Sequence, residues 1–401
     1  MVSARVLGSG HHSNNGMRKK EKHMNSAKPK RRGWKIVLII FLVLVVIAAV
    51  AVGIILSKTV LVKHPELTGE PEVGKWYRIT PEGTKSSDGS EWHGLIRLGT
   101  ENKVVVYFFG GGVSITGETS EGGKEFYATT ASIQDFVASG GISSDSELNP
   151  FKDWTFLVLP YATGDFHCGT GEYHYTDGGK EKTVYHNGYN NYAALIEAAK
   201  QYVGEPDTLL ITGFSAGGFA TSLLADDVID RFPSAENITV SVDSSLLLYD
   251  GWHETATELW NTPQAISDRL TGNNLVLDSL TALYNKRGDT VKILFDCSYR
   301  DDTLMQYQSY INTGKMDQTK ALGDQFQKDL AKMVADLQES IPNVGIYIWR
   351  CGEDADTGNT QHTIISSNVF DALEDGVSVA EWIYAAVNGD VQTHGLELLV
   401  T

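Results

Sequence analysis

The chain has 401 residues, of which 42% are hydrophobic and 21% charged, and its formal net charge is −17. This length and apolar content are enough to bury one large core. Residues 1–35 hold ten Lys or Arg and one acid, so the remaining residues carry a charge of −26. Because no basic run follows Lys58, so acidic a domain is expected to repel nucleic acid, and no nucleic-acid partner is predicted.

Residues 36–56 read IVLIIFLVLVVIAAVAVGIIL, an uninterrupted apolar run. A helix of about 20 apolar residues spans the core of a bilayer, and this run is longer than the apolar region of a cleaved signal peptide. Basic residues crowd its N-terminal side, at 28, 30, 31, 32 and 35. By the positive-inside rule, the pattern predicts an uncleaved anchor in the cell membrane, with residues 1–35 in the cytoplasm and the rest outside.

The segments on either side of this run have no hydrophobic periodicity. Residues 1–35 are polar and basic, which is typical of a disordered tail. Residues 57–75 contain Pro65 and Pro71 and predict a linker. Residues 76–401 are expected to form a single folded domain outside the membrane.

Short apolar runs alternate with helical patterns in residues 76–401. The predicted strands are Val104–Phe109, Trp154–Pro160, Thr208–Thr212, Ile238–Asp243, Val291–Asp296 and Val344–Trp349, and the predicted helices are Asn191–Val203, Gly218–Phe232, Asp317–Ser340 and Val377–Val387. This alternation predicts an α/β fold with a mostly parallel sheet flanked by helices. Residues 245–290 show no clear alternation and are interpreted as an insertion or lid.

The strand predicted at Thr208–Thr212 runs into GFSAG at 213–217, and a helical pattern follows. A strand, a sharp G-x-S-x-G turn and a helix are the context of a nucleophile elbow, in which small neighbours allow the serine a strained backbone. Ser215 is therefore the candidate nucleophile. The alternative is an ordinary glycine-rich turn, because the five letters can also occur by chance.

A serine nucleophile needs a base, usually a histidine that a carboxylate orients, and in α/β hydrolases the acid and then the histidine follow the serine. His362 lies in a polar loop after the last predicted strand and is the candidate base. Asp296, Asp301 and Asp302 end or follow the preceding strand, and Asp301 is the preferred acid. Both loops are expected at the strand ends where Ser215 lies.

The strand at Val104–Phe109 runs into GGGV at 110–113. Such a loop is similar to the oxyanion loops of esterases, because glycine lets backbone N–H groups approach a substrate oxygen. The N–H group of Ala216, the residue after the nucleophile, is the expected second donor. No Lys-Ser or Lys-Thr follows the glycines, which disfavours a phosphate-binding loop.

The chain has three cysteines, Cys168, Cys297 and Cys351. Their spacing fits neither a zinc site nor a disulfide framework, so no metal and no other cofactor is predicted. Cys297 and Cys351 follow the strands that carry the candidate acid and base. The sequence is compatible with a disulfide between them or with two free thiols.

Several segments together resemble the pectin acetylesterase and Notum family of α/β-hydrolase-type carboxylesterases. They are FFGGGV at 108–113, PYATGDFHCGTG at 160–171, VYHNGYNNYAAL at 184–195, GFSAGG at 213–218, VDSS at 242–245 and QHT at 361–363. The resemblance extends from about Trp76 to His362. It implies carboxyl-ester hydrolysis through an acyl-enzyme, with Ser215 as nucleophile, His362 as base and Asp301 as acid.

The resemblance also implies that the oxyanion donors are Gly112, Val113 and Ala216. Plant and animal members usually have tryptophan where Val113 stands and carry many disulfides, so bacterial-type members are the closer match. The loop at 161–171 is similar to a family segment that lines the site, although a purely structural role fits the sequence equally well.

The sequence thus predicts an extracytoplasmic hydrolase that removes O-acyl groups, acetyl first among them, from a polysaccharide. Its expected partners are an acylated carbohydrate or other ester substrate, and the membrane through residues 36–56. A lipase or protein deacylase with a long acyl pocket is the alternative among enzymes. A non-catalytic binding protein of the same fold is the other alternative, but such a protein would be free to lose the nucleophile, the base or the glycine loop, and this chain has all three.

Overall fold

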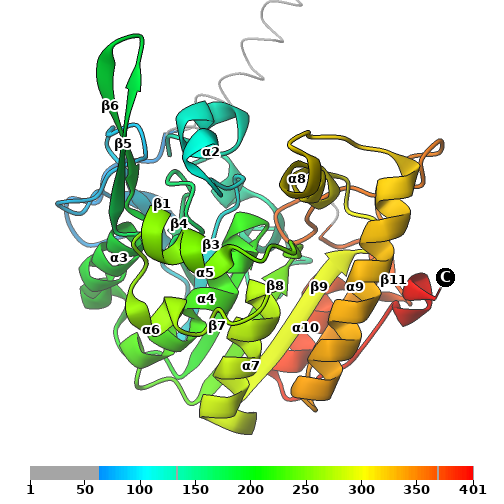
Figure 1. Ribbon diagram of the computed structural model, residues 1–401. Helices are drawn as coiled ribbons and strands as arrows, with labels where there is room; N and C mark the ends of the chain where they lie inside the picture. The colour runs from blue at the N-terminus through cyan, green and yellow to red at the C-terminus, as the bar shows by residue number, and fades with distance from the viewer. Residues whose placement is uncertain (1–62, 132–133, 368–369, 401) are drawn as a thin grey trace, which may run out of the picture. The chain divides into compact units, whose positions relative to one another are not determined.

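The computed structural model describes residues 63–131, 134–367 and 370–400. These residues form an eight-stranded sheet in the order β1-β2-β4-β3-β7-β8-β9-β10 (Figure 1). The pairs β1–β2 and β2–β4 are antiparallel, and all pairs from β4 onward in this order are parallel. The strands are β1 (Trp76–Ile79), β2 (Gly94–Arg97), β3 (Lys103–Phe108), β4 (Thr155–Leu159), β7 (Thr208–Phe214), β8 (Asn237–Asp243), β9 (Val291–Ser298) and β10 (Gly345–Trp349). The six predicted strands are all present, with ends within two residues of those predicted.

Helices cover both faces of this sheet. They are α3 (Gly188–Val203), α4 (Ala216–Arg231), α7 (Leu275–Arg287), α8 (Asp302–Thr313), α9 (Lys320–Ser340) and α10 (Val379–Val387). In Figure 1, α4 and α7 lie in front of the sheet, and α10 lies behind β9. The predicted mostly parallel α/β sheet with flanking helices is therefore confirmed.

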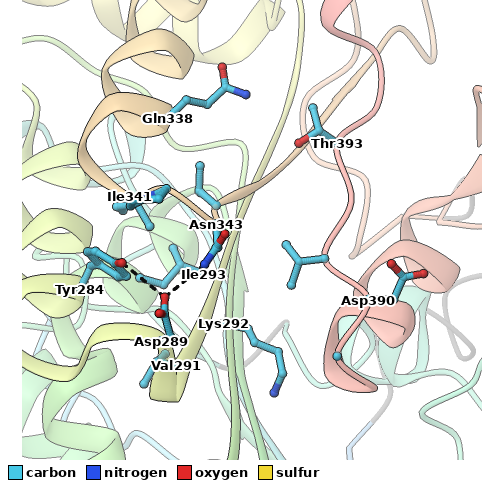
Figure 2. A pocket seen from close by; sticks show the side chains of 14 residues that line it. Tyr284, Asp289, Val291, Lys292, Ile293, Gln338, Ile341, Asn343, Asp390 and Thr393 are labelled. Atoms are coloured by element: carbon cyan, nitrogen blue, oxygen red, sulfur yellow. Dashed lines mark hydrogen bonds between the residues drawn. The ribbon is translucent and has the colours of Figure 1, made fainter.

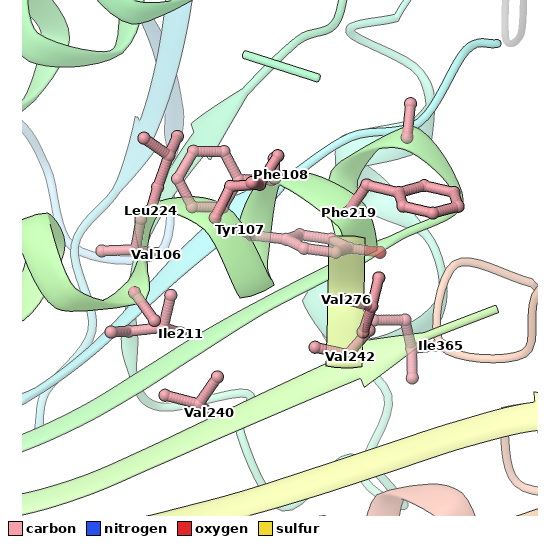
Figure 3. Packing of buried hydrophobic residues seen from close by; sticks show 14 of the residues in the cluster. Val106, Tyr107, Phe108, Ile211, Phe219, Leu224, Val240, Val242, Val276 and Ile365 are labelled. Atoms are coloured by element: carbon pink, nitrogen blue, oxygen red, sulfur yellow. The ribbon is translucent and has the colours of Figure 1, made fainter. Parts of the chain in front are cut away.

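The strands β3, β4 and β7 are largely apolar because both of their faces are buried. Val106, Ile211 and Val240 lie in β3, β7 and β8, and each is fully buried. Figure 3 shows Leu224 of α4 near Val106 and Ile211, and Phe219 of the same helix on the far side of Tyr107. Burial of one such side chain stabilises the fold by about 1.5–3 kcal/mol, so this layer forms a rigid base for the loops above it.

The register of the parallel strands sets which residues meet at their carboxyl ends. Phe214 at the end of β7 pairs with Asp243 at the end of β8, and Asp243 pairs with Asp296 of β9. The residues that follow these strands therefore emerge side by side. In Figure 1 this end of β9 points toward α8.

The segment interpreted as an insertion or lid, residues 245–290, is only partly one. Its second half contains α7, a helix that the sequence did not reveal, which contacts α4, α9 and β9 and so covers the sheet. Its first half contains the short helices α5 (Trp252–Glu254) and α6 (Gln264–Ser267) and a π-helical turn between them. The fully buried Trp252 and Trp260 anchor this half in the core.

Several smaller elements surround the sheet. The hairpin of β5 (Gly171–Asp177) and β6 (Lys180–His186) projects from the body as the green arm in Figure 1. A short helix, α2 (Gly117–Gly122), follows the glycine loop, and the two-residue strands β11 (Leu373–Glu374) and β12 (Val377–Ser378) precede α10. Within the predicted linker, the backbones of residues 65 and 67 exchange hydrogen bonds with Arg78 of β1, so this part lies along the sheet edge.

The predicted cytoplasmic tail and transmembrane segment, residues 1–35 and 36–56, lie outside the described residues. Among the helices that the structure does describe, none is long and apolar enough to cross a membrane.

Candidate active site

Ser215 lies in a strained turn between β7 and α4. Its backbone has φ 56° and ψ −127°, in the left-handed region that non-glycine residues rarely adopt. A Cβ atom on Gly213 would overlap the backbone of Gly217, and one on Gly217 would overlap the backbone of Phe108. The two glycines of the motif are thus required by close backbone approach, and the turn has the geometry of a nucleophile elbow.

His362 and Asp301 are in direct contact. His362 Nδ1 lies 2.7 Å from Asp301 Oδ2, and the Asp301 carboxylate is fully buried. The other oxygen, Oδ1, accepts the N–H groups of Thr303 and Leu304 and so caps the first turn of α8. Because both oxygens of Asp301 are engaged, the carboxylate is fixed and orients the imidazole ring.

The two other candidate acids do not contact His362. Asp302 Oδ1 accepts a hydrogen bond from the hydroxyl of Thr303. Asp296 is buried within β9, and neither oxygen of its carboxyl group has a hydrogen-bond partner among the described residues. Of the three candidates, the structure brings Asp301 to the histidine.

The environment of His362 favours its protonated form. Burial lowers the pKa of His362, but the negative charge of Asp301 and the hydrogen bond to it outweigh this, so the pKa lies above its usual value. Burial raises the pKa of Asp301, and the contact with His362 opposes that rise. A carboxylate can only accept, so Nδ1 carries the hydrogen and Nε2 offers a lone pair. This Nε2 is buried and has no hydrogen-bond partner among the described residues.

Ser215 opens into a small pocket, here called the acyl pocket, with an empty volume of about 220 Å³. Its lining includes the predicted site residues Gly112, Val113 and Ala216. The remaining lining residues are Phe166, Phe219, Leu247, Thr303, Leu304 and Tyr307. Because Thr303 and Leu304 are the residues that Asp301 caps, the nucleophile, the glycine loop and the start of α8 meet in one place.

The oxyanion donors differ in one residue from the prediction. The N–H group of Val113 donates to Phe126 O at 3.1 Å, so Val113 cannot serve as a free donor. The N–H groups of Gly112 and Ala216 make no hydrogen bond to the described residues. Gly112 has φ +81°, and a Cβ atom there would overlap the backbone of Phe126. The available pair is therefore Gly112 and Ala216.

The loop at 161–171 contacts the residue that precedes the glycine loop and so helps to position that loop. His167 donates through Nε2 to the carbonyl of Phe109, 3.0 Å away, directly before the three glycines. Burial lowers the pKa of His167 to about 4, so this ring is neutral. Phe166 and His167 both have positive φ, 49° and 58°. The loop thus positions the glycine loop and places Phe166 in the acyl pocket.

The apolar lining of the pocket was not predicted from the sequence. Phe166 and Phe219 stack with ring centroids 4.4 Å apart, and Trp252 and Trp260 contact Phe166 in turn. These residues come from three distant segments and carry no motif. The cluster of aromatic residues near 245–260 was the available signal, and it was interpreted as a lid.

The cysteines and the one carboxylate cluster found among the described residues do not line the acyl pocket. Cys168, Cys297 and Cys351 are all free thiols, so the disulfide that the sequence allowed is not formed. Within the described residues, the carboxylates of Glu374, Asp375 and Glu397 lie close enough together to admit a metal ion. Exposed acidic groups of this kind are common without an ion, and none of the three lines the acyl pocket.

The model of the family described as Pectinacetylesterase matches residues 87–254. This range contains the glycine loop, the loop at 161–171 and Ser215. The resemblance to the pectin acetylesterase family is confirmed, and the chain is a serine carboxylesterase. The matched range ends before Asp301 and His362, so the assignment of those two residues to the site depends on the geometry described above.

A solved structure extends the likeness in fold beyond the matched range. The Wnt deacylase Notum from Drosophila is similar with a TM-score of 0.57 over 79% of this chain and 94% of that chain. The sequence identity is 17%, so this likeness supports the fold alone. None of the curated proteins matches the chain.

Proposed function

We propose that this carboxylesterase removes acetyl groups from an acetylated polysaccharide outside the cytoplasm, through an acyl-enzyme formed on Ser215. The observation that carries the mechanism is the buried Asp301–His362 pair, whose free Nε2 lies at the strand ends that also hold the serine elbow. A serine alone is a weak nucleophile, and this pair supplies the base that it needs.

The reaction follows from these positions. Ser215 Oγ attacks the ester carbonyl while His362 Nε2 accepts its proton, and Asp301 stabilises the imidazolium that forms. The negative oxygen of the tetrahedral intermediate accepts the N–H groups of Gly112 and Ala216. His362 then gives the proton to the leaving alcohol. In the second half, His362 deprotonates a water molecule that attacks the acyl-enzyme. His362 then returns this proton to Ser215 Oγ as the ester bond breaks, which frees Ser215 and releases acetic acid, ionised to acetate in solution.

The size of the acyl pocket supports a short acyl group. The centre of a water-sized sphere can occupy only about 10 Å³ of it, which is roughly the room that one water molecule needs. The stacked rings of Phe166 and Phe219 form part of its wall, and both are buried. So narrow a pocket favours the shortest acyl groups, acetyl first among them, because a long fatty acyl chain would require these rings to move.

The alcohol side of the ester faces a wider space. A groove with an empty volume of about 1050 Å³ is lined by Gly111, Lys124, Glu125, Phe126, Tyr127, Ala128, Thr129, Thr130 and Tyr307. It shares Tyr307 with the acyl pocket and begins at the glycine loop. Aromatic faces beside polar groups are suited to sugar rings, which supports a carbohydrate as the leaving group.

The proposed location rests on the sequence alone. The apolar run at 36–56 with its basic N-terminal side favours a single-pass anchor that leaves the esterase domain outside the membrane. Protease treatment of intact cells that express the full chain tests this. The esterase domain should be degraded, and protection of that domain would contradict the proposed orientation.

Hydrolysis of 4-nitrophenyl acetate, butyrate and longer esters by the full-length protein tests the activity, with Ser215→Ala as control. We expect the acetate ester to give the highest kcat/KM and the variant to lose about 10⁶ in kcat, as is typical for removal of a nucleophile. Acetate release from acetylated polysaccharides then tests the natural substrate. Preference for long chains would instead support a lipase or protein deacylase, and equal inertness of both proteins would contradict catalysis by Ser215.

A further inference from the structure

Asp243 connects the nucleophile to the loop of the base. It is the last residue of β8, it is fully buried, and it does not line the acyl pocket. Its backbone carbonyl accepts the N–H group of Ser215 at 3.0 Å. Its side-chain Oδ2 accepts the N–H groups of Ile364 and Ile365, both at 3.0 Å. One residue thus holds the serine turn and the segment directly after His362.

Ser244 extends this connection by one more contact. Its hydroxyl donates to Asp243 Oδ1 at 2.6 Å and accepts the N–H group of Thr363 at 3.3 Å. Three consecutive N–H groups after His362 therefore bind to these two side chains, here called the Asp243–Ser244 clamp. Ser244 and Thr363 have φ values of 53° and 63°, and such strained backbone persists where surrounding contacts over-determine it.

The negative charge at this position belongs to Asp243. The carboxyl group of Asp243 accepts three hydrogen bonds, whereas that of its paired neighbour in the sheet, Asp296, has only Asp243 and Trp349 within reach. Burial, and then the charge of Asp243, raises the pKa of Asp296 well above its usual value. Burial also raises the pKa of Asp243, but its donors oppose that rise. The two carboxyl groups therefore titrate as a pair, and the three donors at Asp243 favour the negative charge on Asp243 and the proton on Asp296.

We propose that Asp243 is a positioning residue for the esterase reaction: with Ser244 it fixes the His362 loop against the serine turn. This inference rests on the proposed Ser–His–Asp mechanism. A misplacement of 1 Å in a reacting group can cost about 100-fold in rate, so a clamp at this point affects catalysis without touching substrate. The titratable groups that face Asp243 or His362 are Tyr107 of β3, Asp296 and Cys297 of β9, and Asp301 and Asp302 at the start of α8.

The test removes the negative charge of Asp243 and keeps the shape of its side chain. In Asp243→Asn we expect kcat for 4-nitrophenyl acetate to fall about 10- to 100-fold, with KM unchanged because Asp243 does not line the acyl pocket. The apparent pKa of kcat/KM should move down, because the charge of Asp243 raises the pKa of His362. Asp250→Asn is the matched control, since Asp250 is an exposed acid on the loop that follows β8. Its kinetics should equal those of the wild type.

Thermal unfolding shows whether Asp243→Asn folds. If it does not, Ser244→Ala serves as the test. This variant keeps the Asp243 carboxylate but loses the two hydrogen bonds of the Ser244 hydroxyl, so we expect kcat to be about fivefold lower, with KM and the apparent pKa unchanged. Wild-type kcat in folded Asp243→Asn, or in folded Ser244→Ala where the first variant is unfolded, overturns the clamp. Activity retained in Ser215→Ala would instead refute the proposed mechanism itself, so the two failures are distinguishable.

Discussion

The two ends of the central sheet hold very different cavities. At the carboxyl ends of β7, β8 and β9, loops with strained backbone surround an acyl pocket of only about 220 Å³. At the amino ends of β9 and β10, a cavity of about 1330 Å³ is open to solvent and is lined by residues such as Tyr284, Asp289 and Lys292 (Figure 2). By volume alone, the amino end would be taken for the active site.

Backbone strain and buried charge give the opposite answer. Seven described non-glycine residues have positive φ, and the loops at the carboxyl end contain five of them, namely Phe166, His167, Ser215, Ser244 and Thr363. None of the residues that line the large cavity is among the seven. Its Asp289 is exposed and bonded to Tyr284 and Asn343, as Figure 2 shows. Strain and buried titratable groups, rather than volume, therefore mark the functional end.

The largest effect expected from this difference is that of Asp301→Asn. An amide can still cap α8, but it cannot hold His362 in the required tautomer, so we expect kcat to fall by about 10⁴ with little change in stability. Steady-state kinetics with 4-nitrophenyl acetate measure this. The matched variant at the other end of the sheet is Asp289→Asn, which should keep wild-type kinetics. A comparable loss in both variants would remove the distinction between the two ends.

The pH dependence is expected to be the next largest effect. His362 must be neutral to accept a proton, and its pKa is raised by Asp301, so activity should be lost as the pH falls through a value above the usual pKa of about 6.5. Well below that value, kcat/KM should fall about tenfold for each pH unit. A pH profile on a neutral ester measures this. If kcat/KM began to fall only below pH 6, the charge of Asp301 would not be raising the pKa of His362.

The smallest effect concerns the size of the acyl pocket. Leu247→Ala removes a buried lining side chain, so we expect the ratio of butyrate to acetate turnover to rise about tenfold and stability to fall by about 2–5 kcal/mol. Leu248→Ala is the control, because Leu248 is half-buried and does not line the pocket. An unchanged ratio in the first variant would show that the acyl group binds elsewhere.

Much of the fold could be predicted because the central strands are short runs rich in apolar and β-branched residues. Helix α8 escaped prediction because its buried residues are few, Leu304, Met305 and Ser309, and its start depends on the cap by Asp301. Helix α7 escaped because its sequence follows the aromatic segment that reads as a lid. In both cases tertiary packing, rather than local pattern, decides the helix.

The identities of the site residues followed from motifs, but their contacts did not. Ser215, Asp301 and His362 could be named from the order of strands and loops. The pairing of Val113 with Phe126 is set by the path of the chain after the glycine loop, and no spacing rule shows it. The hydrogen bonds from Ile364 and Ile365 to Asp243 join residues that lie 121 and 122 positions apart along the chain. Such contacts require the folded structure.

The most direct test of the account is to trap the acyl-enzyme. The protein is mixed with 4-nitrophenyl acetate, quenched in acid within milliseconds to seconds and analysed by mass spectrometry of the intact chain and of its peptides. We predict one acetyl group on Ser215 together with a burst of nitrophenol, and neither in Ser215→Ala. Acetylation at another residue, or turnover without any adduct or burst dependent on Ser215, would contradict a mechanism centred on this serine.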